Sequence, residues 1–563
     1  MARAAAIGVQ DFETLIINDY FYVDKTHFIK EWWESGDSVT LITRPRRFGK
    51  TLNMSMLERF FSLKYKGQGE VFERLHIWKE QKYRDLQGTY PVISLSFALI
   101  KERTFEATRA KINSLLSSIY DKNAFLKDSG LLSKNEINYF SRISKEMDDT
   151  DATLALHYMS DFLSRYYGKK VIILLDEYDT PMQEAYVNGY WEEAVAYTRS
   201  LFNAAFKTNP YLERAIMTGI TRVSKESIFS DLNNLEVVTT TSNKYEDVFG
   251  FTETEVFAAM EEFDLEEKET VKLWYDGFIF GSTEDIYNPW SILNYLSKRK
   301  VGTYWANTSS NSLVGKLLRE GNKNVKQDFE KLLNGETIVA SIDEQIVYNQ
   351  LNGSKNATWS MLLASGYLKV LSVDNTAMLA GYGKIKYELT LTNKEVRIMF
   401  DTMVNSWFTE RAETDYNDFI KALLCDDKKL MNIYMNRVAL ETISYFDSGN
   451  RSSEKEPERF YHGFVLGLLV DLRERYMVTS NRESGFGRYD IMLEPRKKED
   501  AAIIMEFKVH DAEEEETLQD TVQAALKQIQ DKEYEQALIG KGIPQNNIRK
   551  YGFAFQGKKV LIG

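Results

Sequence analysis

The chain has 563 residues, a formal net charge of −12, and 43% hydrophobic and 27% charged residues. At roughly 150 residues per domain this length predicts about three or four domains, and the ordinary composition argues against a mostly disordered chain. The negative charge disfavours a basic coat for non-specific nucleic-acid binding, although it leaves room for a local basic groove.

The single cysteine and the first residues indicate the setting. Cys425 can form neither a disulfide within the chain nor a cysteine zinc site, and we interpret it as a small buried hydrophobic residue. The opening MARAAAIGVQDFETL has no apolar core of signal-peptide length, and the apolar run at residues 171–175 is far too short to span a membrane. We therefore expect a soluble cytoplasmic protein without a membrane partner.

Short apolar runs alternate with helix-length stretches through the first 240 or so residues. Nearly continuous apolar runs are typical of buried parallel strands, so they predict an α/β domain over residues 1–245. The runs are residues 39–43, 92–97, 171–175 and 214–220.

Residues 246–450 differ, because helical periodicity dominates there. Residues 252–263 and 393–408 predict helices, and residues 385–391 predict a short strand between them. This pattern predicts a helical connecting region.

The segment SGNRSSEKEPE, residues 448–458, is polar and contains a proline, so it is the best boundary before a last domain at residues 451–563. In that domain residues 459–472 predict a helix, FGRYDIML and AIIMEFKV predict strands, and a long helical stretch follows from about residue 518 to 538. The fold class expected for the whole chain is therefore α/β, with a helical middle.

The string VTLITRPRRFGKT ends in Gly49, Lys50 and Thr51, between a predicted strand and a predicted helix. This is the context that a phosphate-binding P-loop requires, since the N–H groups at a helix start favour an anion. Lys50 is expected to reach the β- and γ-phosphates of ATP or GTP, and Thr51 to place its hydroxyl on Mg²⁺.

The loop departs from the usual pattern at Arg44, where a glycine is expected five residues before Gly49. Arginine does not take the positive φ of glycine freely. Either the loop has a different shape, or Arg44 points elsewhere.

The apolar run VIILLDE ends in Asp176 and Glu177. Asp176 is expected to hold Mg²⁺, and Glu177 to orient and activate the attacking water. A solvated acidic pair at a strand end is the alternative, which the upstream Gly-Lys-Thr disfavours. Thr218 lies near the end of the next apolar run, residues 214–220, and is placed to sense the γ-phosphate. Arg222 follows that run and is placed to stabilise developing charge. Ordinary polarity at a strand end explains this last pair equally well.

Near the C-terminus, Asp490 and Glu506 lie on neighbouring predicted strands, with Lys508 on the face of Glu506 and Phe507 on the opposite face. Charges inside an apolar strand need a reason, because unpaired burial is costly. Converging carboxylates bind a hard cation such as Mg²⁺, and a lysine beside them can hold a water or stabilise a pentavalent phosphate. The pattern predicts metal-assisted phosphodiester hydrolysis, with an internal Glu–Lys ion pair as the alternative.

Two further residues are candidates for the same site. Gln528 on the following helix is placed to face the cleft, and Glu458 to add an acid to the metal. A surface position for Gln528, and a helix-start charge for Glu458, are the alternatives. We interpret His462 and His510 as structural or surface residues.

Taken together, these motifs resemble bacterial proteins that join an AAA-ATPase-like N-terminal domain to a C-terminal PD-(D/E)xK nuclease-superfamily domain. The resemblance runs over nearly the whole chain. It is carried by the strings Tyr22-Val-Asp-Lys-Thr26, Arg44-Pro-Arg-Arg-Phe-Gly-Lys-Thr51, Leu175-Asp-Glu-Tyr-Asp-Thr-Pro181, Thr221-Arg-Val-Ser-Lys-Glu-Ser227, Tyr287-Asn-Pro-Trp290, Phe460-Tyr-His-Gly463, Gly487-Arg-Tyr-Asp490 and Glu506-Phe-Lys508.

The resemblance implies a P-loop ATPase domain, a winged-helix-like middle and a nuclease whose acid, acid and lysine map to Asp490, Glu506 and Lys508. It also implies that the RPRRFGKT form belongs to the family's own loop, with Arg44 and Arg47 among its nucleotide-binding residues.

Three functions compete on these observations. The first is an ATP-regulated, Mg²⁺-dependent nuclease acting on DNA. The second is a nucleotide-dependent switch or scaffold that binds nucleic acid without cutting it. The third, a transporter or metabolic kinase, leaves the C-terminal acids and lysine without a role. The expected partner is nucleic acid, and a homo-oligomer stays open.

Overall fold

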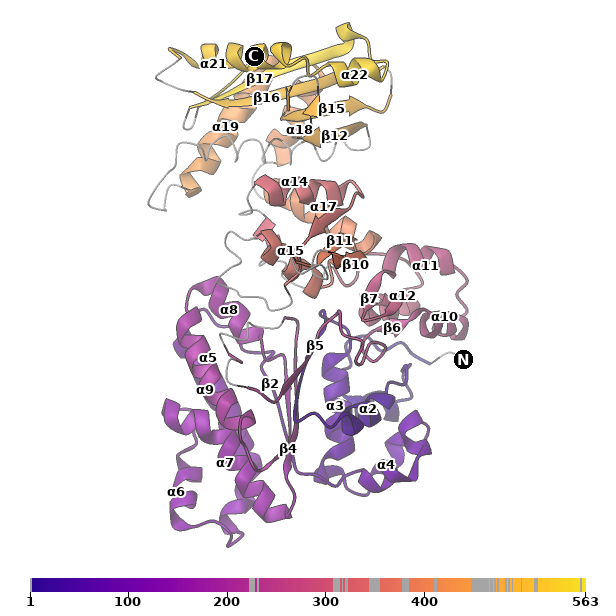
Figure 1. Cartoon of the computed structure of the whole chain (residues 1–563), viewed down its shortest axis with the longest axis vertical. Coiled ribbons are helices and arrows are strands. Elements are labelled where there is room, and N and C mark those ends of the chain that lie inside the picture. The colour runs from indigo at the N-terminus through magenta and orange to yellow at the C-terminus, as the bar shows by residue number, and fades with distance from the viewer. Residues whose placement is uncertain are drawn as a thin grey trace. The chain divides into compact units, whose positions relative to one another are not determined.

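The computed structural model divides into two compact units, Met1–Ile398 and Met399–Gly563 (Figure 1). Each is described by itself below. The structure describes residues 3–221, 228–229, 232–306, 314–315, 317–318, 323–343, 355–376, 384–409, 413–446, 465, 469, 472, 475–480, 483–484, 487–488, 490–497, 499–510, 515–556 and 559–563.

A five-stranded parallel sheet, in the order β2–β3–β4–β1–β5, forms the centre of the first unit. β1 and β3 are buried along their whole length, which explains their continuous apolar sequences. The four predicted strands are present, whereas β5, with the four-residue sequence LEVV, is too short to have been predicted. The strands are β1 (Val39–Thr43), β2 (Val92–Ser96), β3 (Val171–Asp176), β4 (Leu212–Gly219) and β5 (Leu235–Val238).

Helices cover both faces of this sheet: α5, α7 and α9 pack on one face, and α2 and α3 lie on the other (Figure 1). Local signals fix their ends; in α7 the side chain of Asp148 accepts the N–H of Asp151, and Gly168 closes the helix with φ of 63°. The helices of this part are α1 (Phe12–Ile17), α2 (His27–Ser35), α3 (Lys50–Phe61), α4 (Gln81–Leu86), α5 (Phe105–Lys122), α6 (Lys134–Arg142), α7 (Asp149–Tyr167), α8 (Thr180–Asn188) and α9 (Trp191–Phe206).

The rest of the first unit contains helices and two small antiparallel sheets, ordered β6–β8–β7 and β10–β11–β9. The helices and the strand predicted here are found as α10, α17 and β11. The strands are β6 (Phe251–Thr252), β7 (Phe278–Phe280), β8 (Thr283–Tyr287), β9 (Ile338–Ala340), β10 (Leu368–Asp374) and β11 (Lys386–Leu391). The helices are α10 (Glu253–Glu262), α11 (Lys268–Tyr275), α12 (Pro289–Lys298), α14 (Lys323–Leu333) and α15 (Lys355–Ala364), followed by α17 (Lys394–Thr409), which begins in this unit and continues into the second.

The second unit is built on a mixed sheet, in the order β12–β15–β16–β17–β18, in which only the β16–β17 pair is parallel. A short hairpin, β13–β14, lies between β12 and β15 in the sequence. The elements are α18 (Glu413–Leu424), α19 (Lys428–Phe446), β12 (Tyr476–Ser480), β13 (Glu483–Ser484), β14 (Gly487–Arg488), β15 (Ile491–Pro495), β16 (Ala502–Val509), α21 (Leu518–Asp531), α22 (Gln536–Gly540), β17 (Ile548–Gln556) and β18 (Lys559–Ile562).

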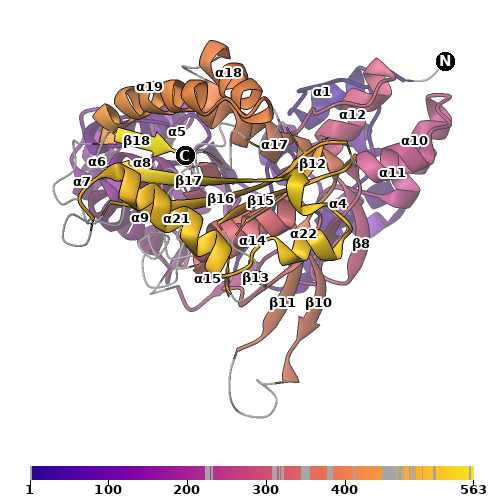
Figure 2. The same ribbon diagram turned by 90° about the horizontal axis from the view of Figure 1, so that it is seen from above.

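Helix α19 runs beside β18 at the edge of this sheet (Figure 2). The amide of Asn432 exchanges two hydrogen bonds with the main chain of Ile562, both of 2.8 Å. Asn436 does the same with Val560, at 2.6 and 2.9 Å. The two side chains therefore supply the hydrogen bonds that a further strand would make, and they cover the edge.

One prediction about the second unit is wrong. The long helix predicted from about residue 518 to 538 is two helices, α21 and α22, separated by a turn in which Glu533 has φ of 51°. The compact unit begins at Met399 and so includes α18 and α19, while the predicted domain start at residue 451 stays a prediction. The predicted boundary, residues 448–458, lies outside the described residues, as does most of the helix predicted at 459–472.

Among the described residues, no helix has the length and apolar character needed to cross a membrane. Cys425 is exposed, which contradicts the prediction of a buried hydrophobic residue. It lies just after α18, where the chain turns toward α19.

Candidate nucleotide-binding and metal-binding sites

The loop that joins β1 to α3 contains the predicted P-loop residues. Gly49 precedes the helix with φ of 80°, and Arg47 also has a left-handed backbone, with φ of 66°. Left-handed residues in a loop help to turn successive N–H groups inward, and such concavities bind anions. The first turn of α3 faces the same loop, and its dipole favours a phosphate.

Lys50 is buried at the start of α3, and its ammonium group lies across the loop. Nζ donates to the main-chain oxygens of Arg44, at 2.9 Å, and Pro45, at 2.8 Å. Burial lowers the pKa of Lys50, and the nearby carboxylates of Glu177 and Asp176 oppose that shift. An ammonium group has three donors, of which the loop carbonyls take two.

Asp176, at the end of β3, is held between two hydroxyl groups. Thr51 Oγ1 donates to Asp176 Oδ2 at 2.7 Å, and Thr218 Oγ1 donates to Asp176 Oδ1. Burial raises the pKa of Asp176, while the two hydroxyl donors favour its ionised form. The ends of two neighbouring strands and the start of α3 thus bring together three residues that the sequence singled out.

Glu177 follows with a left-handed backbone, φ of 52°, which turns the chain sharply after the strand. Its N–H donates to Thr218 Oγ1 at 3.3 Å, and its Oε2 accepts from the Thr180 hydroxyl at 3.2 Å. The side chain is half-buried, beside Asp176.

Asp179 is a residue that the sequence reasoning missed. Its buried Oδ2 accepts the N–H groups of Ile220, at 3.0 Å, and Thr221, at 2.9 Å, and burial raises its pKa. A Cβ atom at Gly219 would lie 2.7 Å from Asp179 Oδ1, so the glycine makes room for this carboxyl. Asp179 ties the end of β4 to the turn that carries Glu177. Its place in the string Leu175-Asp-Glu-Tyr-Asp-Thr-Pro181 is the signal that was available.

Arg44 resolves the departure in the loop. Its guanidinium is fully buried and donates to the main-chain oxygens of Thr43, at 3.0 Å, and Thr239, at 2.6 Å, and it lies 4.6 Å from the ring centre of Phe280. The left-handed residue is Arg47, and Arg44 is not among the residues with positive φ. These contacts support a role for the Arg44 side chain in shaping the loop, and its nucleotide-binding role stays a prediction.

Arg47 is exposed, with its guanidinium 4.3 Å from the ring centre of Trp290, and its nucleotide-binding role stays a prediction. Arg222 lies outside the described residues, so its predicted role stays open as well.

The C-terminal acids come together as neighbours on adjacent strands. The pairing of Ile491 with Met505 places Asp490 opposite Glu506. Asp490 Oδ2 accepts the N–H of Phe507 at 2.8 Å, and the N–H of Asp490 points at Glu506 Oε2 at 3.4 Å. The carboxylates therefore converge on one side of the sheet.

Gln528 joins these acids from α21, since its Nε2 donates to Glu506 Oε1. A Cβ atom at Gly552, the β17 partner of Glu506, would lie 2.7 Å from the main-chain oxygen of Val522. Gly552 thus lets α21 approach the sheet closely enough for this contact. Gln528 is half-buried and faces Glu506, so it is not a surface residue.

Side chains alternate along β16 as the sequence indicated. Glu506 is 3% exposed on one face, and Lys508 is half-buried two residues later on the same face. Phe507 faces the core, where its ring centre lies 4.8 Å from that of Phe553. Two adjacent carboxylates beside a lysine form a donor set that suits Mg²⁺. Glu458, the predicted additional ligand, lies outside the described residues.

Of the two histidines that the sequence singled out, His510 is among the described residues. His510 Nδ1 lies 3.0 Å from Thr521 Oγ1 and 3.4 Å from a carboxylate oxygen of Glu515. These contacts support a structural interpretation. His462 lies outside the described residues.

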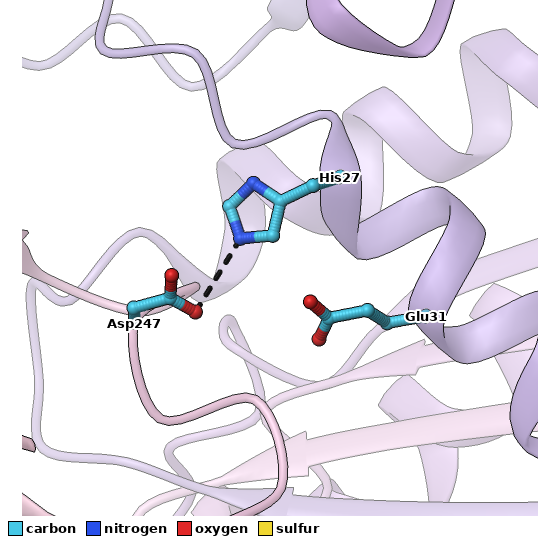
Figure 3. A group of neighbouring side chains, drawn as sticks. All are labelled: His27, Glu31 and Asp247. Atoms are coloured by element: carbon cyan, nitrogen blue, oxygen red, sulfur yellow. Dashed lines mark ion pairs between the residues drawn. The ribbon is translucent and has the colours of Figure 1, made fainter. Parts of the chain in front are cut away.

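A third polar group lies elsewhere in the first unit (Figure 3). His27 and Glu31 from α2 face Asp247, with candidate ligand atoms within 4.8 Å of one another and His27 Nε2 3.4 Å from Asp247 Oδ1. The ammonium group of Lys25 donates to the main-chain oxygen of Asp247 at 2.6 Å and pairs with Glu255 at 2.7 Å. Because His27 pairs directly with the carboxylate of Asp247, we interpret the group as an ion pair and not as a metal centre.

A parallel sheet with Lys50 and Thr51 at the loop after β1, and with Asp176 at the end of β3, is the fold of a P-loop NTPase. Family models agree: residues 6–229 match a model described as Predicted AAA-ATPase, and residues 456–563 match the PD-(D/E)XK nuclease superfamily. The chain therefore joins an AAA-ATPase-like segment to a C-terminal PD-(D/E)XK nuclease-superfamily segment, as its motifs predicted.

Individual relatives add little about role. An uncharacterized protein in the vnfD 5' region of Azotobacter chroococcum mcd 1 is 25% identical over 394 residues, which is 69% of this chain and 68% of that protein. A crystal structure of a Signal Transduction ATPase with Numerous Domains (STAND) protein with a tetratricopeptide repeat sensor, from Pyrococcus horikoshii, shares 14% identity, with a TM-score of 0.24. The match covers 81% of this chain and 54% of that one, and a likeness this slight carries no argument.

Proposed function

We propose that the chain binds and hydrolyses ATP at the β1–α3 loop, with GTP as the alternative nucleotide, and that it couples this site to Mg²⁺-dependent cleavage of DNA in its second unit. The bond of 2.7 Å between Thr51 Oγ1 and Asp176 Oδ2 supports the nucleotide site most directly. It joins the hydroxyl and the carboxylate that hold Mg²⁺ in P-loop enzymes.

At the first site, Lys50 has one donor beyond its two loop carbonyls to offer to the β- and γ-phosphates. Thr51 and Asp176 would hold Mg²⁺, which neutralises charge on the phosphate oxygens. Glu177 accepts a proton from the water that attacks the γ-phosphorus, and Thr218 keeps Asp176 in place.

At the second site, Asp490 and Glu506 would hold Mg²⁺, which lowers the pKa of a bound water and stabilises the phosphorane charge. Lys508 orients the attacking water from the same face of β16. Gln528 positions Glu506 by donating to its Oε1. The convergence of these side chains from two strands and a helix supports the nuclease proposal.

The test compares the full-length protein with three variants in ATP-binding, ATP-hydrolysis and DNA-cleavage assays with Mg²⁺ or Mn²⁺. Lys50→Ala should abolish ATP binding, because it removes the phosphate-binding ammonium group. Glu177→Gln should bind ATP but lose turnover by about 100-fold or more, as expected when a general base is removed. Lys508→Ala should stop cleavage and leave ATP binding unchanged.

Lys64→Ala, an exposed lysine just beyond α3, is the matched control for Lys50→Ala. Unchanged ATP affinity and turnover in Lys50→Ala would remove the P-loop assignment. Normal turnover in Glu177→Gln would show that another group is the base.

The alternative is a nucleotide-dependent scaffold that binds nucleic acid without cutting it, and the net charge of −12 bears equally on both functions. DNA binding without cleavage, in both the wild type and Lys508→Ala, would decide for the scaffold.

A further inference from the structure

The β1–α3 loop is gripped by residues far along the first unit. The main-chain oxygen of Arg46 accepts two hydrogen bonds, from Asn288 Nδ2 at 3.3 Å and from Trp305 Nε1 at 3.0 Å. The next residue, Arg47, places its guanidinium over Trp290, 4.3 Å from the ring centre. Two consecutive residues of the loop are thus held by the first residues of α12 and by Trp305, which follows that helix.

The neighbouring loop residues are fixed from the same region. The buried ring of Phe48 packs against Phe278, with ring centres 4.8 Å apart. A Cβ atom at Gly366 would lie 2.8 Å from Pro45 Cγ, so that turn passes directly against the loop.

This grip has a physical reason in the backbone of Arg47. A left-handed conformation, here with φ of 66°, is unfavourable for a residue with a side chain and persists only where its surroundings impose it. Arginine does not favour this conformation, so local preference at Arg47 does not account for the shape of the loop. The hydrogen bonds to Arg46 and the contact of Arg47 with Trp290 impose it from outside.

Both donors depend on Glu395, a carboxylate in the first turn of α17 that is 1% exposed. Its Oε1 accepts the N–H groups of Tyr304 at 2.5 Å and Trp305 at 2.7 Å, and that of Ala306 at 3.3 Å. Its Oε2 accepts from the hydroxyl of Ser291 at 2.7 Å, in the first turn of α12. Glu395 therefore joins the segment of Trp305 to the helix that Asn288 caps, although it does not touch the loop.

We infer that Asn288 and Trp305, set in place by Glu395, are positioning residues for the nucleotide site, holding the phosphate loop in its binding shape through the carbonyl of Arg46. The inference rests on the proposed binding of ATP. Without these donors the loop occupies other shapes, and the apparent affinity falls with the fraction of molecules in the competent one. The Tyr287-Asn-Pro-Trp290 string thereby acquires a role.

The decisive variant is Asn288→Asp. The Oδ1 of Asn288 accepts the N–H groups of Trp290 and Ser291, and aspartate caps a helix as well as asparagine does. The substitution keeps that cap but replaces the Nδ2 donor with an oxygen that repels the carbonyl of Arg46. The expected result is an ATP dissociation constant about three- to tenfold higher by titration calorimetry, in a protein that still unfolds in a cooperative transition above the assay temperature.

Trp305→Phe removes the second donor and should weaken ATP binding by a similar factor. Its matched control is Trp359→Phe, since Trp359 is a fully buried tryptophan of the same region whose indole N–H has no hydrogen-bond partner among the described residues. The control should lose stability comparably and keep the wild-type dissociation constant. Glu395→Gln should weaken binding in the same direction as Trp305→Phe.

Wild-type affinity, or tighter binding, in both Asn288→Asp and Trp305→Phe would overturn the inference while the ATP site stands. Equal weakening by Trp359→Phe and Trp305→Phe would overturn it too, because general loss of packing would then explain the effect. A wild-type protein that does not bind ATP would instead remove the proposed function, and this inference with it.

Discussion

Some side chains at the candidate sites contact a proposed metal-binding or phosphate-binding residue and would act by positioning it. Gln528 does so at the second site, where its amide donates to one oxygen of Glu506 while Tyr534 approaches the same amide at 3.3 Å. A residue that orients a metal-binding carboxylate matters almost as much as the carboxylate itself, because it fixes the direction of the oxygen.

Gln528→Ala should therefore weaken Mn²⁺-dependent DNA cleavage and metal affinity by roughly 10- to 100-fold without unfolding the protein. A Mn²⁺ titration of cleavage rate, with circular dichroism as the fold check, measures this. Gln523→Ala, at an exposed position on the same helix, is the control. If both variants titrate like the wild type, Gln528 has no part in holding Glu506.

The sequence predicted the residues whose spacing is local. Glu506 and Lys508 follow from the two-residue period of strands, Asp490 from the neighbouring strand-like segment, and Lys50 and Thr51 from a contiguous motif. Trp305 was not identified, because its partner Arg46 is 259 residues away and nothing in the intervening sequence records the contact. Glu395 was missed for the same reason, since its role depends on main-chain groups about 90 residues earlier.

At the scale of elements, strongly apolar strands and periodic helices were predictable, and breaks within them were not. β1 and β3 are buried on both faces, so their sequences signal them plainly. Between α21 and α22 the chain turns at Glu533, which has a left-handed backbone. Glycine or asparagine usually marks such a turn in a sequence, and glutamate does not. β5 was not predicted because it has only four residues, and it is recognised as a strand through its pairing with β1.

The ion pair between α2 and the segment before β6 predicts a dependence of stability on pH. Burial opposes charging of His27, but its hydrogen bond to Asp247 and the charge of that carboxylate outweigh burial and raise the pKa of His27. A raised pKa in the folded state contributes stability that is complete below the ordinary histidine pKa of about 6.5. That contribution is lost as the pH rises through the raised value.

At about pH 6 the free energy of unfolding of His27→Gln should therefore be lower than that of the wild type by up to about 1 kcal/mol. At about pH 9 the two free energies should be nearly equal. Urea unfolding at the two pH values measures the difference. Asp247→Asn should show the same pattern, since it removes the partner. An equal deficit at both pH values would mean that packing, and not charge, is lost.

At the scale of the whole molecule, the sequence predicted an N-terminal parallel α/β domain, a helical middle and a C-terminal nuclease-like domain, and the fold class agrees. The division into compact units falls at Met399, which composition does not mark. The amphipathic helices α18 and α19 look alike whichever neighbour they serve, and only their contacts assign them. Buried Phe419 and Met431 share a core with Ile491 and Phe507 of the C-terminal sheet.

The asparagine pair on α19 bears on where this chain can be cut. A fragment of residues 451–563, the boundary that composition suggests, would lack Asn432 and Asn436 and present β18 as a bare template for another strand. A fragment of residues 399–563 would keep them. We expect the shorter piece to self-associate and the longer one to stay dispersed, as light scattering would show; equal behaviour would contradict this. Self-association of the shorter piece alone would mean that two amide side chains, outside the residues that match the nuclease superfamily, protect the edge of its sheet from pairing with another copy.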